Sequence, residues 1–177
     1  SKRKADIYIK INGYVRGISI KKGVKNSVHN ESIGTLVSFF RKIGIDEDII
    51  EKFLYYQYAD GTINGTGKTR ISSSLYREKH QRDIDEINKV LNDEKYINAF
   101  VNRFVLQGNK SEYEVDAIIY GVVEDFIFIT KEEVYYIMRK HLEDEISSLH
   151  ISLLTLQPMA RNLNYNPKYE ACRNQVQ

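Results

Sequence analysis

The sequence has one cysteine, two prolines, no tryptophan and no long apolar run. The lone thiol, Cys172, excludes a disulfide within the chain, and disulfide frameworks are typical of small secreted proteins. No apolar stretch approaches the roughly 20 residues that a membrane helix needs, and the first residues lack the apolar core of a secretory signal. We therefore expect a cytoplasmic protein with no membrane partner.

The composition is nevertheless that of a chain that folds. Hydrophobic residues make up 42% and charged residues 28% of the 177 residues, which suits one domain, and we expect a single domain over residues 1–177. The net charge of +2 is too small to indicate a nucleic-acid-binding protein by itself. The bases, however, gather near the N-terminus, at positions 2, 3, 4, 10, 16, 21, 22 and 25. That basic edge indicates either a polyanionic partner or an ordinary solvated face.

The pattern of apolar residues predicts a mixed α/β fold, in which helices flank a central sheet. Residues 5–21 alternate apolar and polar side chains on either side of Asn12-Gly13, a pair typical of two-residue hairpin turns because both positions need positive φ. The other elements that we expect are helices over 33–43 and 47–58, one long or two successive helices over 77–104, strands over 115–120 and 125–129, a helix from Thr130 to about 146 that opens with a capping box, and a strand near 151–156.

The loop after the second predicted helix contains Gly67-Lys68-Thr69, which is superficially similar to a phosphate-binding loop. Thr62 stands where that motif needs a glycine, and a helix rather than a strand precedes the loop. We therefore expect a flexible surface loop, whose Lys68 and Arg70 could lie along DNA.

The predicted hairpin gathers polar side chains at its open end. With the turn at positions 12 and 13, paired residues have numbers that sum to 25, so Asp6 lies opposite Ser19 and both point to one face. Strand alternation puts Lys21 on that face as well. An ion pair between Asp6 and Lys21, worth less than about 1 kcal/mol, would explain the same pattern without any chemistry.

The order of these residues resembles the PD-(D/E)XK nuclease superfamily. In that family an aspartate begins one core strand and an acid-x-Lys triplet ends the next, as Asp6 and Ser19-Ile20-Lys21 do here, except that Ala5 replaces the family's proline and Ser19 its second acid. Some restriction enzymes of the family also have Ser-x-Lys. The following segment, KNSVHNE at 25–31, resembles a segment of type II restriction endonucleases usually written Asn-Ser-Val-His-Gln-Glu.

The resemblance implies a restriction-endonuclease-like fold and Mg²⁺-dependent hydrolysis of DNA, with sequence specificity. Asp6 and the backbone carbonyl of Ile20 would be metal ligands, and Lys21 would orient or activate the attacking water. Glu31 is the candidate for the acid missing at Ser19, although it could equally interact with the N-terminus of the next helix. Because the family places a helix before this hairpin, one expectation is a fragment that lacks an N-terminal helix and the last strand.

The resemblance also implies double-stranded DNA as the partner, and a homodimer if both strands are cut. Lysines suit contacts to phosphate, whereas arginine and asparagine suit contacts to base edges. The residues that we expect at DNA are Lys22, Lys25, Asn26, His29, Gln157, Arg161, Asn162 and Arg173. A structural role for His29 and Asx turns in the Asn-rich C-terminal segment are the alternatives. A nuclease fold without catalysis that binds DNA or protein, or a small protein-interaction domain, remains open.

Overall fold

The computed structural model describes residues 4–22, 27–109, 114–159 and 167–177. The chain divides into two compact units. The first unit consists of Ser1–His29 and Glu94–Leu142, and the second consists of Asn30–Asp93 and Glu143–Gln177. Each unit is described separately, and the expectation of a single domain over the whole chain stays a prediction.

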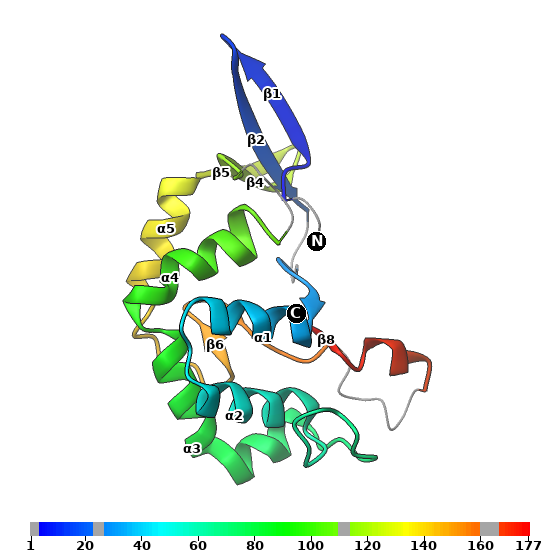
Figure 1. Cartoon of the computed structure of the whole chain (residues 1–177). Helices are drawn as coiled ribbons and strands as arrows, with labels where there is room; N and C mark the ends of the chain where they lie inside the picture. Colours follow the sequence, from blue (N-terminus) through cyan, green and yellow to red (C-terminus); the bar gives the residue numbers. More distant parts are fainter. Residues whose placement is uncertain (1–3, 23–26, 110–113, 160–166) are drawn as a thin grey trace. The chain divides into compact units, whose positions relative to one another are not determined.

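The first unit contains a four-stranded mixed sheet with the strand order β1-β2-β4-β5 (Figure 1). Its strands are β1 (Ile7–Ile11), β2 (Tyr14–Lys21), β4 (Ala117–Val122) and β5 (Asp125–Thr130). Strands β1 and β2 form one antiparallel hairpin, β4 and β5 form another, and β2 and β4 join the two hairpins in parallel. The expectation of an α/β fold with a mixed central sheet is confirmed.

The first hairpin has the turn and the register that the sequence predicts. Asn12 and Gly13 have φ values of 49° and 85°, so both residues of the turn adopt the left-handed conformation that Asn-Gly favours. Ile7 pairs with Ile18 and Ile11 pairs with Tyr14, and the numbers of each pair sum to 25. Every side chain of the hairpin therefore lies on its expected face.

Helical segments complete the first unit. They are α4 (Glu94–Val101), the π-helical turn η1 (Asn102–Leu106) and α5 (Lys131–Lys140), and α4 packs against α5. The predicted capping box opens α5. The Thr130 hydroxyl accepts a hydrogen bond from the Glu133 N–H, and the Glu133 carboxylate accepts one from the Thr130 N–H. The helix ends at Lys140, short of the predicted residue 146. Apolar side chains buried in this unit include Ile97, Phe100, Phe104, Leu106 and Met138.

The second unit is mainly helical. Its helices are α1 (Ile33–Lys42), α2 (Glu47–Tyr58), α3 (Ser73–Leu91) and the 3-10 helix η3 (Pro167–Cys172). The helices predicted over 33–43 and 47–58 are confirmed, and the helical stretch predicted over 77–104 consists of two successive helices, α3 and α4. Buried side chains of α1, α2 and α3 form the core, with Phe40, Phe53 and Ile87 inaccessible to solvent.

Short strands complete the second unit, where β3 (Glu31–Ser32) pairs with β8 (Gln175–Val176), and β6 (His150–Ile151) pairs with β7 (Leu154–Thr155). The single strand predicted near 151–156 is wrong. Ser152 has a φ of 50°, and the chain turns there, so that β6 and β7 pair with each other.

Within the part of the chain that the structure describes, no helix is both long and apolar enough to cross a membrane.

Candidate functional site

The open end of the first hairpin holds the carboxylate of Asp6 against the end of β2. The backbone N–H of Asp6 donates to the carbonyl oxygen of Ile18 at 2.8 Å, which extends the hairpin beyond β1. Oδ2 of Asp6 accepts hydrogen bonds from the backbone N–H of Ile20 at 2.7 Å and from Oγ of Ser19 at 3.3 Å. The structure thus brings together Asp6 and Ser19, as the predicted register requires.

The backbone of Ile20 adds a second oxygen to this end of the hairpin. In a strand, the N–H and the C=O of one residue point to the same side. Since the N–H of Ile20 points to Asp6, its carbonyl oxygen also lies on the side of the strand where Asp6 is found. A carboxylate and a backbone carbonyl are both oxygen ligands of the kind that Mg²⁺ prefers.

Lys21 is the last residue of β2 and lies beside Tyr120 of β4. Strand alternation puts its side chain on the same face as that of Ser19. The ammonium group of Lys21 makes no ion pair with Asp6 or with any other acid among the described residues. A cross-strand ion pair therefore does not account for the lysine at this position.

Ser19 is almost inaccessible to solvent, with 1% of its surface exposed, whereas Asp6 is exposed. A buried hydroxyl that already donates to Asp6 is poorly placed to contact a metal or a substrate. Ser19 is therefore better suited to holding the Asp6 carboxylate in place than to replacing the acid that the nuclease motif has at this position.

Asp116 is a further acid beside the hairpin, and sequence reasoning missed it. Its Oδ2 accepts a hydrogen bond from the Gly17 N–H at 2.8 Å, and its Oδ1 pairs with the guanidinium of Arg16 at 2.8 Å. Partial burial by itself would raise the pKa of Asp116. The Gly17 hydrogen bond and the charges of Arg16 and Lys131 lower the pKa by more than burial raises it, so the net pKa lies below its usual value. The contacts fix where β4 meets β2.

Lys4 is another residue whose role the sequence does not indicate. It belongs to the basic N-terminal run, yet it is 4% exposed, and its ammonium group donates to the carbonyl oxygens of Val28 and Phe104. Lys4 therefore connects the segment before the hairpin to η1. Only the long-range fold brings these carbonyls to Lys4, so no local sequence signal identifies them.

His29 and Glu31 are both buried. The ring of His29, 7% exposed, lies 5.3 Å from the Phe104 ring, a contact that favours the structural alternative for this residue. Glu31 is 4% exposed, and its backbone lies opposite that of Val176 where β3 pairs with β8 in the second unit. It stands immediately before Ser32, whose Oγ caps α1 by accepting a hydrogen bond from the Thr35 N–H. Because Glu31 and Asp6 belong to different units, the role of Glu31 as the missing acid stays a prediction.

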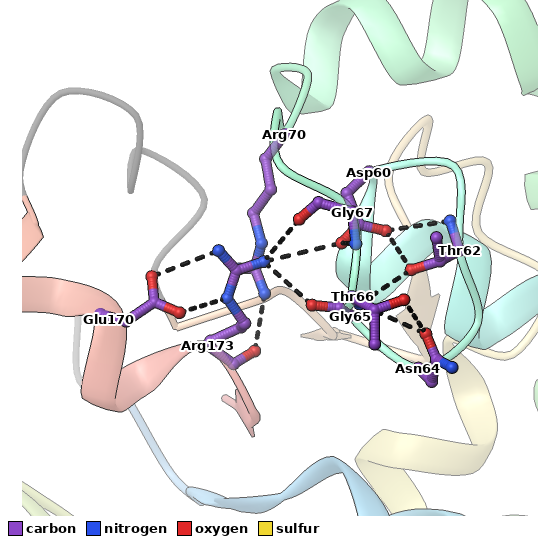
Figure 2. Close-up of polar contacts among 9 residues, drawn as sticks. All are labelled: Asp60, Thr62, Asn64, Gly65, Thr66, Gly67, Arg70, Glu170 and Arg173. Carbon is purple, nitrogen blue, oxygen red and sulfur yellow. Dashed lines mark hydrogen bonds and ion pairs between the residues drawn. The ribbon is translucent and has the colours of Figure 1, made fainter.

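Arg173 makes an extensive set of contacts within the second unit (Figure 2). Its Nε and Nη2 contact the Glu170 carboxylate at 2.5 and 3.2 Å. Its Nη1 donates to the carbonyl oxygens of Gly65 and Gly67 at 3.2 and 3.3 Å and lies 3.6 Å from Oδ2 of Asp60. The hydrogen bond from Arg173 also lowers the pKa of Glu170. The donors expected to contact a base are thus used by the protein, and DNA binding by Arg173 stays a prediction.

The loop that Arg173 contacts is hydrogen-bonded around Asp60, whose side chain is fully buried. The Asp60 carboxylate accepts from the N–H and hydroxyl of Thr62 and from the N–H of Gly67, at 2.7 to 3.0 Å. Arg70, expected to lie along DNA, is instead 4% exposed, and its Nη2 donates to the Arg173 carbonyl oxygen at 2.8 Å. Its burial makes that expectation wrong for Arg70, and the loop is more organised than the sequence suggests.

The structure describes only two of the other residues predicted to contact DNA. Lys22 is exposed directly after β2, and Gln157 is exposed beside the C-terminus, where its backbone exchanges hydrogen bonds with Gln177 at 2.9 and 3.0 Å. Four further residues predicted at DNA lie outside the described residues: Lys25, Asn26, Arg161 and Asn162. DNA contacts by all six residues stay predictions.

Across the described residues, no group of three or more histidine, cysteine, aspartate and glutamate side chains is arranged to hold a metal ion. At the hairpin end, the protein offers one carboxylate, from Asp6, and one carbonyl, from Ile20. Mg²⁺ commonly keeps several waters and takes only one or two carboxylates together with substrate phosphates, so this set fits a metal that binds together with its substrate.

No protein-family model matches the chain, and no curated protein matches it either. The resemblance to the PD-(D/E)XK nucleases therefore depends on the chain's own residues and their geometry.

Proposed function

We propose that this protein is a Mg²⁺-dependent endonuclease that hydrolyses DNA phosphodiester bonds, similar to a type II restriction enzyme with a restriction-endonuclease-like fold. The observation that carries the proposal is the geometry at the open end of the first hairpin. There the exposed Asp6 carboxylate is held by Ile20 and Ser19, and Lys21 follows on the same face without an acidic partner among the described residues.

Each residue of this group has a separate task in the proposed reaction. The Ile20 N–H and the Ser19 hydroxyl hold Oδ2 of Asp6, while Oδ1 accepts no hydrogen bond from the described residues. The carboxylate is thus oriented before a ligand arrives. Bound Mg²⁺ would polarise the phosphodiester and lower the pKa of a coordinated water. The Lys21 ammonium, which has three donors, would orient the attacking water or stabilise the charge that develops on the phosphate.

Plasmid cleavage tests this assignment. We expect the unaltered protein to cut plasmid DNA in Mg²⁺ and not in EDTA. Asp6→Asn removes the charge that holds the metal, and Lys21→Ala removes the ammonium group, so each should slow cutting by roughly 100-fold or more. Lys140→Ala, an exposed lysine at the end of α5 in the same unit, is the matched control and should cut normally.

Circular dichroism of all three variants checks that the fold is retained. No cutting of any DNA by the unaltered protein in Mg²⁺ would overturn the proposal, as would normal cutting by Asp6→Asn.

A nuclease fold that binds DNA without cutting it is the second candidate. The hairpin end has only one carboxylate among the described residues, which favours this candidate, because most metal-dependent nucleases need more than one acid. In that case the protein would bind DNA with an affinity that falls steeply as salt rises, in proportion to the number of phosphate contacts, and would leave the plasmid intact. Salt-dependent binding and cleavage measured on the same sample separate the two candidates.

A further inference from the structure

Strand β1 forms an open edge of the first unit's sheet. Among the described residues it pairs only with β2, so its outer backbone groups have no strand beside them. All five residues of β1, IYIKI, are exposed, with exposures of 44% for Ile7, 40% for Ile9 and 55% for Ile11. The strand has no proline, and its only charge is Lys10. An exposed, apolar edge strand of this kind pairs readily with a strand from another molecule.

We propose that β1 pairs with β1 of a second copy of this chain, antiparallel and centred on Ile9. In this register the residue numbers of each pair sum to 18. Ile9 meets the partner's Ile9, Ile7 meets the partner's Ile11, and Lys10 meets the partner's Tyr8. The two sheets join into one sheet of eight strands through an isologous contact, which closes after two copies.

The side chains of β1 are complementary to themselves in this register. Isoleucines meet isoleucines on one face, and on the other each Lys10 ammonium lies beside the partner's Tyr8 ring, an arrangement that favours a cation–π contact. Centring the pair on Lys10 would instead oppose two like charges, and a shift by one residue would set Ile7 or Ile9 against Lys10. The Ile9 register uses all five residues of the strand and opposes no like charges.

The same face of the sheet carries further exposed apolar side chains, together with Arg16, which lies opposite Ile9. The register of the strands places Tyr14, Phe126 and Phe128 on the face of Ile7, Ile9 and Ile11. Tyr14 is 71%, Phe126 55% and Phe128 53% exposed. These six side chains together expose on the order of 600 Å² of surface.

Disulfide trapping tests the register directly. In a Cys172→Ser background, which has no thiol, Ile9→Cys places two cysteines opposite each other across the two-fold axis, within the reach of a disulfide. We expect mild oxidation to convert most of this variant into a covalent dimer. Ile11→Cys is the matched control, because Ile11 is more exposed but meets the partner's Ile7, and it should stay monomeric on a non-reducing gel.

Equal trapping at both positions would overturn the register, because it would indicate random collision. Light scattering provides the second readout: the unaltered protein should be a dimer, Ile9→Lys a monomer, and Val123→Lys a dimer, since Val123 is 87% exposed in the turn between β4 and β5. A monomeric unaltered protein at the concentrations used would overturn the proposal. Neither readout needs DNA or metal, so the outcome is independent of the proposed nuclease activity.

Discussion

At the scale of single residues, Asp116 stabilises the first unit in a pH-dependent way. Burial raises its pKa, but hydrogen bonds from Gly17 and Arg16 lower it more, so the net pKa is below its usual value in the folded state. A carboxyl whose folded pKa is depressed adds stability above its unfolded pKa, and this stability is lost as pH falls through the folded pKa. Asp116→Asn should therefore be less stable than the unaltered protein at pH 7, and the difference should shrink below about pH 4.

Urea unfolding at a series of pH values measures this difference. Asp125→Asn removes an exposed acid from the start of β5 and controls for the change in net charge. A difference between Asp116→Asn and the unaltered protein that stays constant from pH 7 to pH 2 would contradict the assignment.

Residue by residue, the sequence predicts the contacts that local geometry determines. The meeting of Asp6 with Ser19 follows from a two-residue turn, because the turn sets the register of its hairpin. The contact between Asp116 and Gly17 could not be predicted, since these residues are separated by 99 positions. Lys4 and Phe104, 100 positions apart, are a second example. Which strand lies beside β2 depends on the whole fold and not on any nearby residue.

At the scale of elements, the loop from Asp60 to Gly67 depends on a countercharge from the C-terminal segment. Arg173→Ala leaves the buried Asp60 carboxylate without that charge and should lower the free energy of unfolding by about 2–4 kcal/mol. Arg173→Lys should restore only part of this stability, because a point charge cannot reach Asp60 and the Gly65 and Gly67 carbonyls together.

Chemical denaturation of the two variants beside Lys68→Ala tests this dependence, since Lys68 is exposed in the same loop. If Arg173→Ala is no less stable than Lys68→Ala, the contacts of Arg173 do not stabilise the loop.

Substitutions at two glycines of the same loop distinguish the cost of backbone strain from the cost of steric overlap. Gly61 and Gly65 have similar positive φ values, 80° and 71°, so an alanine at either position is strained. A Cβ at Gly61 meets nothing within 4 Å, whereas a Cβ at Gly65 would overlap the ring of Tyr58. Gly65→Ala should therefore be less stable than Gly61→Ala by about 1–3 kcal/mol in thermal unfolding. Equal losses would show that the Tyr58 ring moves aside at little cost.

Elements with a strong periodic pattern could be predicted, and elements that depend on a single backbone angle could not. Helices α1 and α2 follow their apolar spacing and begin at Ile33 and Glu47, as predicted. The turn at Ser152 needs a positive φ, which serine rarely adopts, so nothing in the sequence signals the break between β6 and β7. The loop around Asp60 was missed because its hydrogen bonds involve short polar side chains typical of any loop.

At the scale of the whole molecule, each unit has its own core. A substitution that destabilises one core should therefore increase local unfolding mostly within that unit. Phe53 in α2 and Phe100 in α4 are both fully buried. Truncating either to alanine costs about 3–5 kcal/mol. In hydrogen exchange, Phe53→Ala should speed exchange in α1 and α2 more than in β4 and β5, and Phe100→Ala should do the reverse. Uniform acceleration in both variants would show that the units open together.

The parallel pairing of β2 with β4 also has a consequence for how the chain acquires its structure. Ile18 pairs with Ala117, so the centre of the sheet cannot form until the chain beyond residue 117 has left the ribosome. Until then the first hairpin, which can form within microseconds, has no neighbouring strand for the inner edge of β2. Closing such a long loop is entropically costly and slow. During synthesis, the unpaired inner edge of β2 is therefore open to pairing with strands of other chains.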